Sequence, residues 1–206
     1  MLDNQNLRVA SDRLCLIPYR REHVDIYHGW MQDPYILEMT ASEPLSLEEE
    51  YEMQQSWAED PKKATFIVVR PNGGSDSSTE ELIGDVNLFF NDYDDPKCAE
   101  IDVMIARSDA RGQGLGREAV LLMLHYALTR LEISRVFCKI NEVNESSLKL
   151  FRKLDFVDVK YVSAFKEYEL ELPVTDSAEL TATIQSRLSS PVVYSEFSAN
   201  SFSSEC

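Results

Sequence analysis

The sequence predicts a mixed α/β fold of the α+β type, in which helices cover the faces of one mixed sheet. Two kinds of pattern lead to this prediction. Several short segments alternate apolar and polar residues with the period of two typical of strands, and others repeat apolar residues at helical spacing. Of the 206 residues, 44% are hydrophobic and 27% are charged, so the chain can bury the core that such a fold needs.

The first half of the chain is predicted to combine antiparallel strands with two helices. Its clearest local signal is Ser46-Leu47-Glu48-Glu49, a capping box in which the serine oxygen accepts a free backbone N–H and Glu49 reaches back. In chain order we expect a strand or hairpin at 7–18, a helix at 22–31, a helix at 46–59, and strands at 66–70 and 82–91 on either side of a Gly/Ser/acidic loop at 71–81.

The second half is predicted to alternate strands and helices. Ile101, Val103 and Ile105 occur at every second position of the segment 99–106, which is the pattern of a strand. Apolar residues at helical spacing then predict a long helix. We expect a strand at 99–106, a helix at 114–131, a strand at 136–140, a helix at 145–154, and strands at 156–159 and 165–172.

A change of composition after residue 172 predicts the domain boundary. Residues 173–206 contain nine serines and lose periodicity, apart from a short helical pattern near 178–188. A segment of this composition buries too little apolar surface to order itself. We therefore predict one folded domain over residues 1–172 and a flexible serine-rich tail over residues 173–206.

Charge and cysteine usage limit the classes of function. The chain has 36 Asp and Glu against 20 Lys and Arg, a formal charge of −16. This argues against nucleic-acid or anionic-membrane partners and favours cationic ones such as amines or basic peptides. The four cysteines form no CxxC pair and no cluster with zinc spacing, so we expect neither a metal site nor a disulfide framework. With no signal peptide or long apolar stretch, a cytoplasmic or nuclear location is expected.

The glycines are concentrated in one place. Three of the seven lie at 112, 114 and 116, in Arg111-Gly-Gln-Gly-Leu-Gly-Arg117, where the predicted strand leads into the long helix. Glycine lets a ligand approach the backbone, and the free N–H groups and dipole of a helix N-terminus favour an anion, most often a phosphate. Arg111 and Arg117 add positive charge. The alternative is a helix start that needs only a tight turn.

Two common phosphate motifs fit this loop poorly. A P-loop requires Gly-Lys-Ser/Thr, whereas Leu115-Gly116-Arg117 stands here. Gly114-x-Gly116-x-x-Ala119 matches a relaxed dinucleotide fingerprint. However, residues 107–113 separate it from the strand, and Glu132 comes before the next strand instead of at its end.

The order of motifs resembles the GNAT superfamily of acetyltransferases, whose (Gln/Arg)-x-x-Gly-x-(Gly/Ala) loop holds acetyl-CoA. The matching motifs are the strand Ala99–Ala106, the loop Arg111–Gly116, the strand end at Asn141, Asn144-x-x-Ser147 and Phe151-x-Lys-Leu-Asp-Phe156. The resemblance covers residues 7–172 and implies a GNAT-like, centrally splayed mixed sheet flanked by helices. Asp155 departs from the pattern, because relatives usually have glycine there; a positive φ would explain this preference.

Three shorter segments resemble the N-acetyltransferase 9 family, which is associated with N-terminal acetylation of proteins, with tubulin as a proposed substrate. They are Thr40–Leu45, Gly84–Phe89 and Gly114–Val120. The resemblance implies that acetyl-CoA is the co-substrate and that a protein or peptide, tubulin among the candidates, is the acceptor. The implied cofactor-binding residues are Val103, Met104 and Ile105 for the pantetheine arm, Arg111, Gly112, Gln113, Gly114, Leu115, Gly116 and Arg117 for the pyrophosphate, and Asn144 and Ser147 at the following helix.

Catalysis is predicted to involve Glu100, Asp102 and Ser147. Acetyl transfer to an amine needs a base, and Glu100 and Asp102 share one face of their strand, where two carboxylates can raise each other's pKa. Glu100 aligns with a glutamate frequent in the ribosomal-protein branch of the superfamily and is preferred. The alternative is a solvated strand face. Phe151 replaces a tyrosine general acid of many relatives, which leaves Ser147, Tyr35, Tyr161, water or an unprotonated thiolate.

The sequence is compatible with three functions. The first is a protein N-terminal acetyltransferase, whose acidic mouth would attract a positively charged N-terminus. That mouth would consist of Asp92, Asp94, Asp95, Glu100 and Asp102, which could equally form a solvated acidic turn. The second is a catalytically weak CoA-binding regulatory protein. The third is an acetyltransferase for lysine side chains or small amines.

Overall fold

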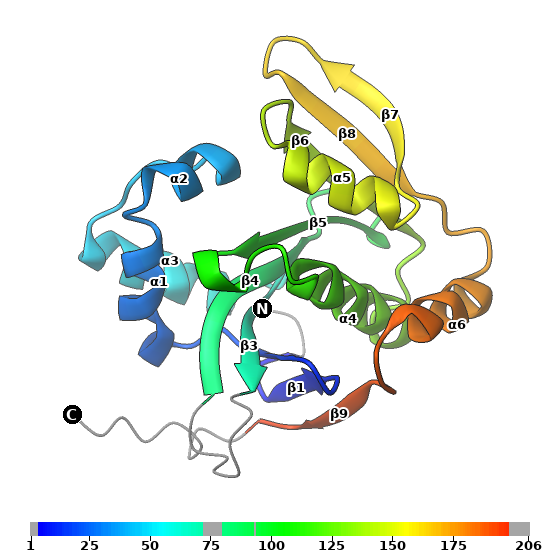
Figure 1. Cartoon of the computed structure of the whole chain (residues 1–206), viewed down its shortest axis with the longest axis horizontal. Helices are drawn as coiled ribbons and strands as arrows, with labels where there is room; N and C mark the ends of the chain where they lie inside the picture. Colours follow the sequence, from blue (N-terminus) through cyan, green and yellow to red (C-terminus); the bar gives the residue numbers. More distant parts are fainter. Residues whose placement is uncertain (1–3, 72–79, 93, 198–206) are drawn as a thin grey trace.

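A nine-stranded mixed sheet organises the molecule, as the sequence predicts (Figure 1). The computed structural model describes residues 4–71, 80–92 and 94–197. The strand order is β7-β8-β6-β5-β4-β3-β2-β1-β9. The strands are β1 (Leu7–Ala10), β2 (Cys15–Pro18), β3 (Lys63–Pro71), β4 (Glu80–Phe89), β5 (Cys98–Ile105), β6 (Arg135–Asn141), β7 (Val157–Val162), β8 (Glu167–Leu172) and β9 (Val193–Glu196).

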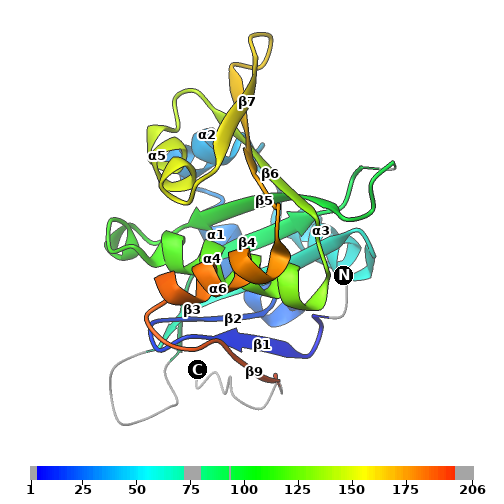
Figure 2. The ribbon, with the colours of Figure 1, turned by 90° about the vertical axis from the view of Figure 1, so that its right-hand side faces the viewer.

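Helices lie on both faces of the sheet (Figures 1 and 2). They are α1 (Val24–Trp30), α2 (Pro34–Thr40), α3 (Leu47–Glu59), α4 (Leu115–Arg130), α5 (Glu145–Lys153) and α6 (Ser177–Arg187). Short 3-10 turns precede α1 and α4, at Arg21–His23 and Ser108–Ala110. Among the described residues, no helix combines the length and the apolar character needed to cross a membrane.

Two apolar clusters hold the layers together. The larger one packs α4 and α5 against one face of the sheet, and the smaller one packs the segment from α1 to α3 against the other. Helix α4 is buried nearly all round, from Leu115 to Leu128. Such a helix needs cover on its outer side as well as on its sheet side.

The predicted capping box is confirmed. The Ser46 hydroxyl oxygen accepts a hydrogen bond from the N–H of Glu49 at 3.3 Å, and the Glu49 carboxylate accepts the N–H of Ser46 at 2.8 Å. Helix α2 was not among the predicted elements. Its signals are present, because Asp33 accepts the N–H of Tyr35 and Pro34 occupies the first turn, but seven residues give too little periodicity. Residues 72–79 of the predicted 71–81 loop lie outside the described residues.

The prediction of a flexible tail from residue 173 is wrong for the part that the structure describes. Helix α6 packs on α4, and β9 pairs antiparallel with β1 as the edge of the sheet (Figure 2). Ile184, Leu188 and Phe197 are buried. Composition misled here because α4 supplies the apolar partner surface that the segment lacks by itself. Residues 198–206 lie outside the described residues.

The sheet divides where β5 meets β6, its one parallel pair in the described chain. Pairing joins only three residues of each strand and ends at Glu100 opposite Phe137. Beyond that point β5 continues along β4 to Ile105, whereas β6 continues along β8 to Asn141. The two strands therefore separate, and the β6 side of residues 102–105 is left without a strand partner. This is the central splay that the resemblance to the GNAT superfamily implies.

Gly84 brings β4 close to β5 beside this opening. A Cβ added at residue 84 would lie well inside the van der Waals distance of the Met104 carbonyl oxygen. We predict that Gly84→Ala lowers the free energy of unfolding, measured by urea denaturation, by about 1–3 kcal/mol because β5 must move. Gly29→Ala is the control, since nothing lies within 4 Å of the added Cβ; it should be neutral or stabilising. Equal destabilisation by both variants would contradict the close-approach argument.

The packing of α6 leads to a second prediction. Ile184 is 3% exposed, so Ile184→Ala should reduce the free energy of unfolding by about 2–5 kcal/mol. Ser186→Ala, on an exposed part of the same helix, should change it by less than about 0.5 kcal/mol. Equilibrium denaturation of the full chain measures both. If Ile184→Ala is as stable as the parent, α6 does not cover α4 in solution.

Candidate active site

Two cavities meet at the splay between β5 and β6. The first, which we call the loop cavity, has a volume of about 510 Å³ and lies between the glycine loop, β5 and the start of α5. The second, the acidic cavity, has about 350 Å³ and lies on the face of the sheet covered by α1 to α3. Both are lined by Met39, Thr40, Val103, Met104, Asn144 and Ser147. A ligand in one cavity can therefore reach a ligand in the other.

The loop cavity gathers the predicted cofactor-binding residues. Of the twelve, eleven line it: Val103, Met104, Ile105, Arg111, Gly112, Gly114, Leu115, Gly116, Arg117, Asn144 and Ser147. The exception is Gln113, whose side chain turns back to donate a hydrogen bond to the Asp109 carbonyl oxygen. Its own carbonyl oxygen accepts from Arg13 at 2.7 Å, so Gln113 braces the loop from outside.

Backbone N–H groups form the anion-accepting part of this cavity. Gly112 and Gly114 have backbone φ angles of +73° and +77°, which residues with a Cβ rarely adopt. Helix α4 begins directly afterwards, and its first capping bond joins the N–H of Glu118 to the carbonyl of Gly114 at 3.1 Å. In the described chain, no hydrogen bond uses the N–H groups of residues 112–117. These donors and the helix dipole suit a phosphate or diphosphate.

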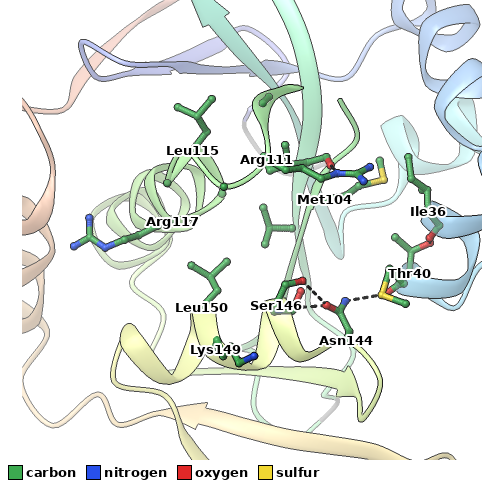
Figure 3. Close-up of a pocket in the computed structure, with 18 of the residues that line it drawn as sticks. Ile36, Thr40, Met104, Arg111, Leu115, Arg117, Asn144, Ser146, Lys149 and Leu150 are labelled. Carbon is green, nitrogen blue, oxygen red and sulfur yellow. Dashed lines mark hydrogen bonds between the residues drawn. The ribbon is translucent and has the colours of Figure 1, made fainter. Parts of the chain in front are cut away.

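Both loop arginines line the cavity, and their guanidinium groups are bound to main-chain carbonyl oxygens of the protein. Arg111 donates to the carbonyl oxygens of Ile105 at 2.8 Å and Ala106 at 2.7 Å, which ties the loop to the end of β5. Arg117 points away from α5 (Figure 3) and donates to the Arg187 carbonyl at the end of α6, at 3.1 Å. Two cations that the sequence reasoning missed, Lys149 and Lys153 on α5, line the opposite wall; their i, i+4 spacing was the available signal.

Asn144 connects the two sides of the loop cavity. Its side-chain oxygen accepts the Ser147 N–H at 3.1 Å and the Ser146 hydroxyl at 3.0 Å, and so caps α5 (Figure 3). Its amide group donates to the Met39 carbonyl at the end of α2, at 3.1 Å. Ser147 follows in the first turn of α5, where both cavities meet.

The acidic cavity contains both predicted carboxylates, but they differ in their partners. Glu100 accepts a hydrogen bond from the Lys139 ammonium at 2.8 Å and forms an ion pair with it. Asp102 accepts from the Asn87 amide at 2.8 Å, and the same amide donates to Asp85 at 2.8 Å. Sequence reasoning missed Asp85 and Asn87. The available signal was their alternation with apolar residues along β4.

Burial changes the proton affinities in this cavity. It raises the pKa of Asp85, and the neighbouring Asp102 charge raises it further. The Asp102 side chain is open to the cavity, yet protein surrounds it closely enough that desolvation also raises its pKa. The Asn87 hydrogen bond and the Lys63 charge oppose this shift. Burial lowers the pKa of Lys63 to about 8, and its ammonium lies 2.9 Å from the centre of the Trp57 ring.

The candidate proton donors and the predicted acidic mouth each include residues that line a cavity and residues that do not. Phe151 is buried against Phe156 and lines the acidic cavity, Tyr35 lines the loop cavity, and Tyr161 lines neither because its hydroxyl donates to Glu142. Of the predicted acidic mouth, only Glu100 and Asp102 line the cavity; Asp92, Asp94 and Asp95 do not. Asp155 has φ of +67°, which explains the preference for glycine there. Among the described residues, no group of three or more His, Cys, Asp or Glu could hold a metal ion.

Comparison with known proteins identifies the family. The family model described as an acetyltransferase (GNAT) domain matches residues 13–157. The chain belongs to the GNAT acetyltransferase family. A protein from Nematostella vectensis named N-acetyltransferase 9-like protein is 45% identical over 184 residues, which are 88% of this chain and 93% of that protein. The Homo sapiens protein named alpha/beta-tubulin-N-acetyltransferase 9 is 46% identical over 179 residues, 84% of this chain and 86% of that protein.

Solved GNAT structures share the fold. Spermidine N-acetyltransferase from Vibrio cholerae, in complex with CoA and spermine, has a TM-score of 0.65 at 20% identity, covering 78% of this chain and 94% of that one. The family model and the sequence relatives identify the chain as an N-acetyltransferase of the N-acetyltransferase 9 group within the GNAT family.

The two roles of Asn144 can be separated by substitution. Asn144→Ala should lower the free energy of unfolding by about 0.5–2 kcal/mol because α5 loses its cap. Asn144→Asp keeps an oxygen for the Ser147 N–H but cannot donate to Met39. It should recover most of the stability while α2 exchanges its amide hydrogens faster than in the parent, as measured by hydrogen exchange. Unchanged exchange of α2 in both variants would show that Asn144 does not hold α2 against α5.

Proposed function

We propose that the chain transfers the acetyl group of acetyl-CoA to the α-amine of a protein N-terminus. The observation that carries this proposal is the meeting of two unlike cavities at Val103 and Met104. One offers free backbone N–H groups and lysines, which suit a diphosphate. The other offers carboxylates, which suit an amine. Holding two reactants at such a junction can supply about 7–11 kcal/mol of the activation barrier.

The loop cavity fits acetyl-CoA, which supplies the activated acetyl thioester. Residues 112–117 would hold its diphosphate through backbone N–H groups, and Lys149 and Lys153 would add positive charge from α5. The β6 side of Val103 to Ile105 has no strand partner in the described chain. The Ile105 carbonyl oxygen is bound by Arg111, and the other backbone groups on this side can pair with an amide-containing arm.

Asp102 is the better placed proton acceptor of the two predicted carboxylates. The Glu100 carboxylate is held in an ion pair by Lys139, which leaves it less available to an incoming amine, whereas burial makes Asp102 more basic than a free aspartate. As the acetyl C–N bond forms and the thioester C–S bond breaks, an ammonium substrate loses two protons in all. One ends on the departing thiolate and the other leaves through the base. Ser147, at the junction of the cavities, is the proposed proton donor to the sulfur.

Tubulin is the first acceptor to test. The Homo sapiens relative carries this substrate in its name, and the acidic cavity suits a positively charged N-terminus by charge. The acidic cavity is also lined by the aromatic side chains of Tyr27, Trp57 and Phe89, against which the first side chain of a peptide can pack. Lysine side chains and polyamines are cationic as well, so the position of the acetyl group in the product must decide.

The proposal is tested by acetyl-CoA calorimetry and by peptide acetylation with mass spectrometry. Wild-type protein should bind acetyl-CoA and acetylate tubulin N-terminal peptides on the α-amine. Asp102→Asn should reduce kcat by about 10²–10⁴-fold with unchanged acetyl-CoA affinity, and Glu100→Gln should reduce it less.

Other outcomes point to other functions. Acetyl groups found only on lysine side chains or polyamines would replace the acceptor. Normal acetyl-CoA binding without turnover on any peptide would favour a regulatory CoA-binding protein. Absence of acetyl-CoA binding would reject the proposal.

A further inference from the structure

We infer that Asp85 is a positioning residue for Asp102, and that the Asn87 amide joins the two carboxylates into one functional pair. This inference rests on the proposed function, since Asp102 is the proton acceptor there. It assigns a residue of β4 to the active site, in addition to residues of the glycine loop and of β5.

The geometry of the pair follows from strand register. Asn87 on β4 lies directly opposite Asp102 on β5, and Asp85 lies two residues earlier on the same face of β4. An amide nitrogen carries two hydrogens, and those of Asn87 are given to Asp85 and Asp102, each at 2.8 Å. Both carboxylates are thereby held at a fixed distance from each other, with Asp102 on the side of the splay.

Burial makes a purely structural role for Asp85 a poor explanation. Asp85 and Asn87 are each 3% exposed, and no ion pair within 4.0 Å reaches Asp85 among the described residues. A buried carboxylate without an ion-pair partner destabilises a fold, and an apolar residue would pack there at less expense. The Asn87 side-chain oxygen also has no hydrogen-bond partner in the described chain. A buried acceptor of this kind beside an amine site suits an N–H donor.

The groups facing the pair determine its charge. They are Tyr27 on α1, Glu50 on α3, Tyr19 after β2, Lys63 on β3, Glu100 on β5 and, through Glu100, Lys139 on β6. The Tyr27 hydroxyl donates to Asp85 at 3.4 Å. Burial and the charge of Asp102 raise the pKa of Asp85, while Lys63, Asn87 and Tyr27 lower it. The pair therefore releases its two protons in linked steps above the ordinary aspartate range.

The pairing predicts how substitutions move these steps. In Asp102→Asn the negative neighbour of Asp85 is gone, so Asp85 should titrate about one pH unit lower. In Asp85→Asn, Asp102 no longer titrates together with a neighbouring carboxyl group, so the pH profile of acetylation should fit one proton release instead of two linked ones. In Lys63→Met a positive charge that favours the ionised pair is lost, so the pH at which acetylation begins to rise should move up. Asp94→Asn, an exposed change of equal charge outside both cavities, should leave it unchanged.

The experiment combines two independent readouts. Carbon-13 NMR of the aspartate carboxyls titrates Asp85 in the ligand-free full chain of the parent and of Asp102→Asn. The pH profile of kcat is then measured for the parent, Asp85→Asn, Lys63→Met and Asp94→Asn. If Asp85→Asn does not fold, Tyr27→Phe serves in its place; it removes a hydrogen bond that lowers the pKa of Asp85, so the Asp85 midpoint should move up.

Each outcome decides one claim. Linked titration above about pH 5, together with loss of the second step in Asp85→Asn and an upward shift in Lys63→Met, supports the pair. An Asp85 midpoint near 4, about that of a free aspartate, or one unaffected by Asp102→Asn, overturns it, as does parental turnover with a parental pH profile in Asp85→Asn. Failure of the parent to acetylate any amine would reject the proposed function instead, because the NMR titration needs no turnover.

Discussion

The divergence of β5 from β6 is the constraint on which the rest of the molecule depends. Their parallel pairing ends at Glu100 and Phe137, after which each strand follows a different antiparallel neighbour. Beyond Glu100, the β6 side of β5 therefore has no strand partner at the centre of the sheet. Buried backbone N–H and C=O groups are unfavourable unless something hydrogen-bonds to them. The opening also joins the loop cavity to the acidic cavity. Gly84, which lets β4 approach Met104, keeps the free part of β5 in place on its other side.

Helix α4 links the stability of the fold to the chemistry of the loop. Its N-terminus presents the free N–H groups of the glycine loop, and its buried length anchors that N-terminus between the sheet and α6. The loop arginines reinforce the same link, since Arg111 binds the end of β5 and Arg117 binds the end of α6. In a protein of formal charge −16, the proposed diphosphate site therefore relies on oriented backbone dipoles, with Lys149 and Lys153 as nearby cations.

The opposite face of the sheet shows the usual conflict between stability and function. Lys63, Asp85 and Asn87 are buried among apolar and aromatic groups of α1 and α3. Such groups are unfavourable in a core unless they are paired, and local departures from packing rules are expected at functional sites. The hydrogen bonds of Asn87 to Asp85 and Asp102 and the aromatic surroundings of Lys63 reduce this penalty. The pKa values of Asp85 and Lys63 nevertheless stay shifted from their ordinary values.

Local sequence signals were enough to locate most of the elements and the candidate anion site. Periodicity located most strands and helices, the capping box set the start of α3, and the glycines at 112, 114 and 116 marked the anion site, because these signals act between near neighbours. Only the tertiary structure decided the rest. Strand register placed Asp85 and Asn87 beside Asp102, and ion pairing distinguished Glu100 from Asp102. Contact with α4 holds α6, and pairing with β1 holds β9. These outcomes depend on groups far apart in the chain, and no local pattern encodes which distant surface a side chain will meet.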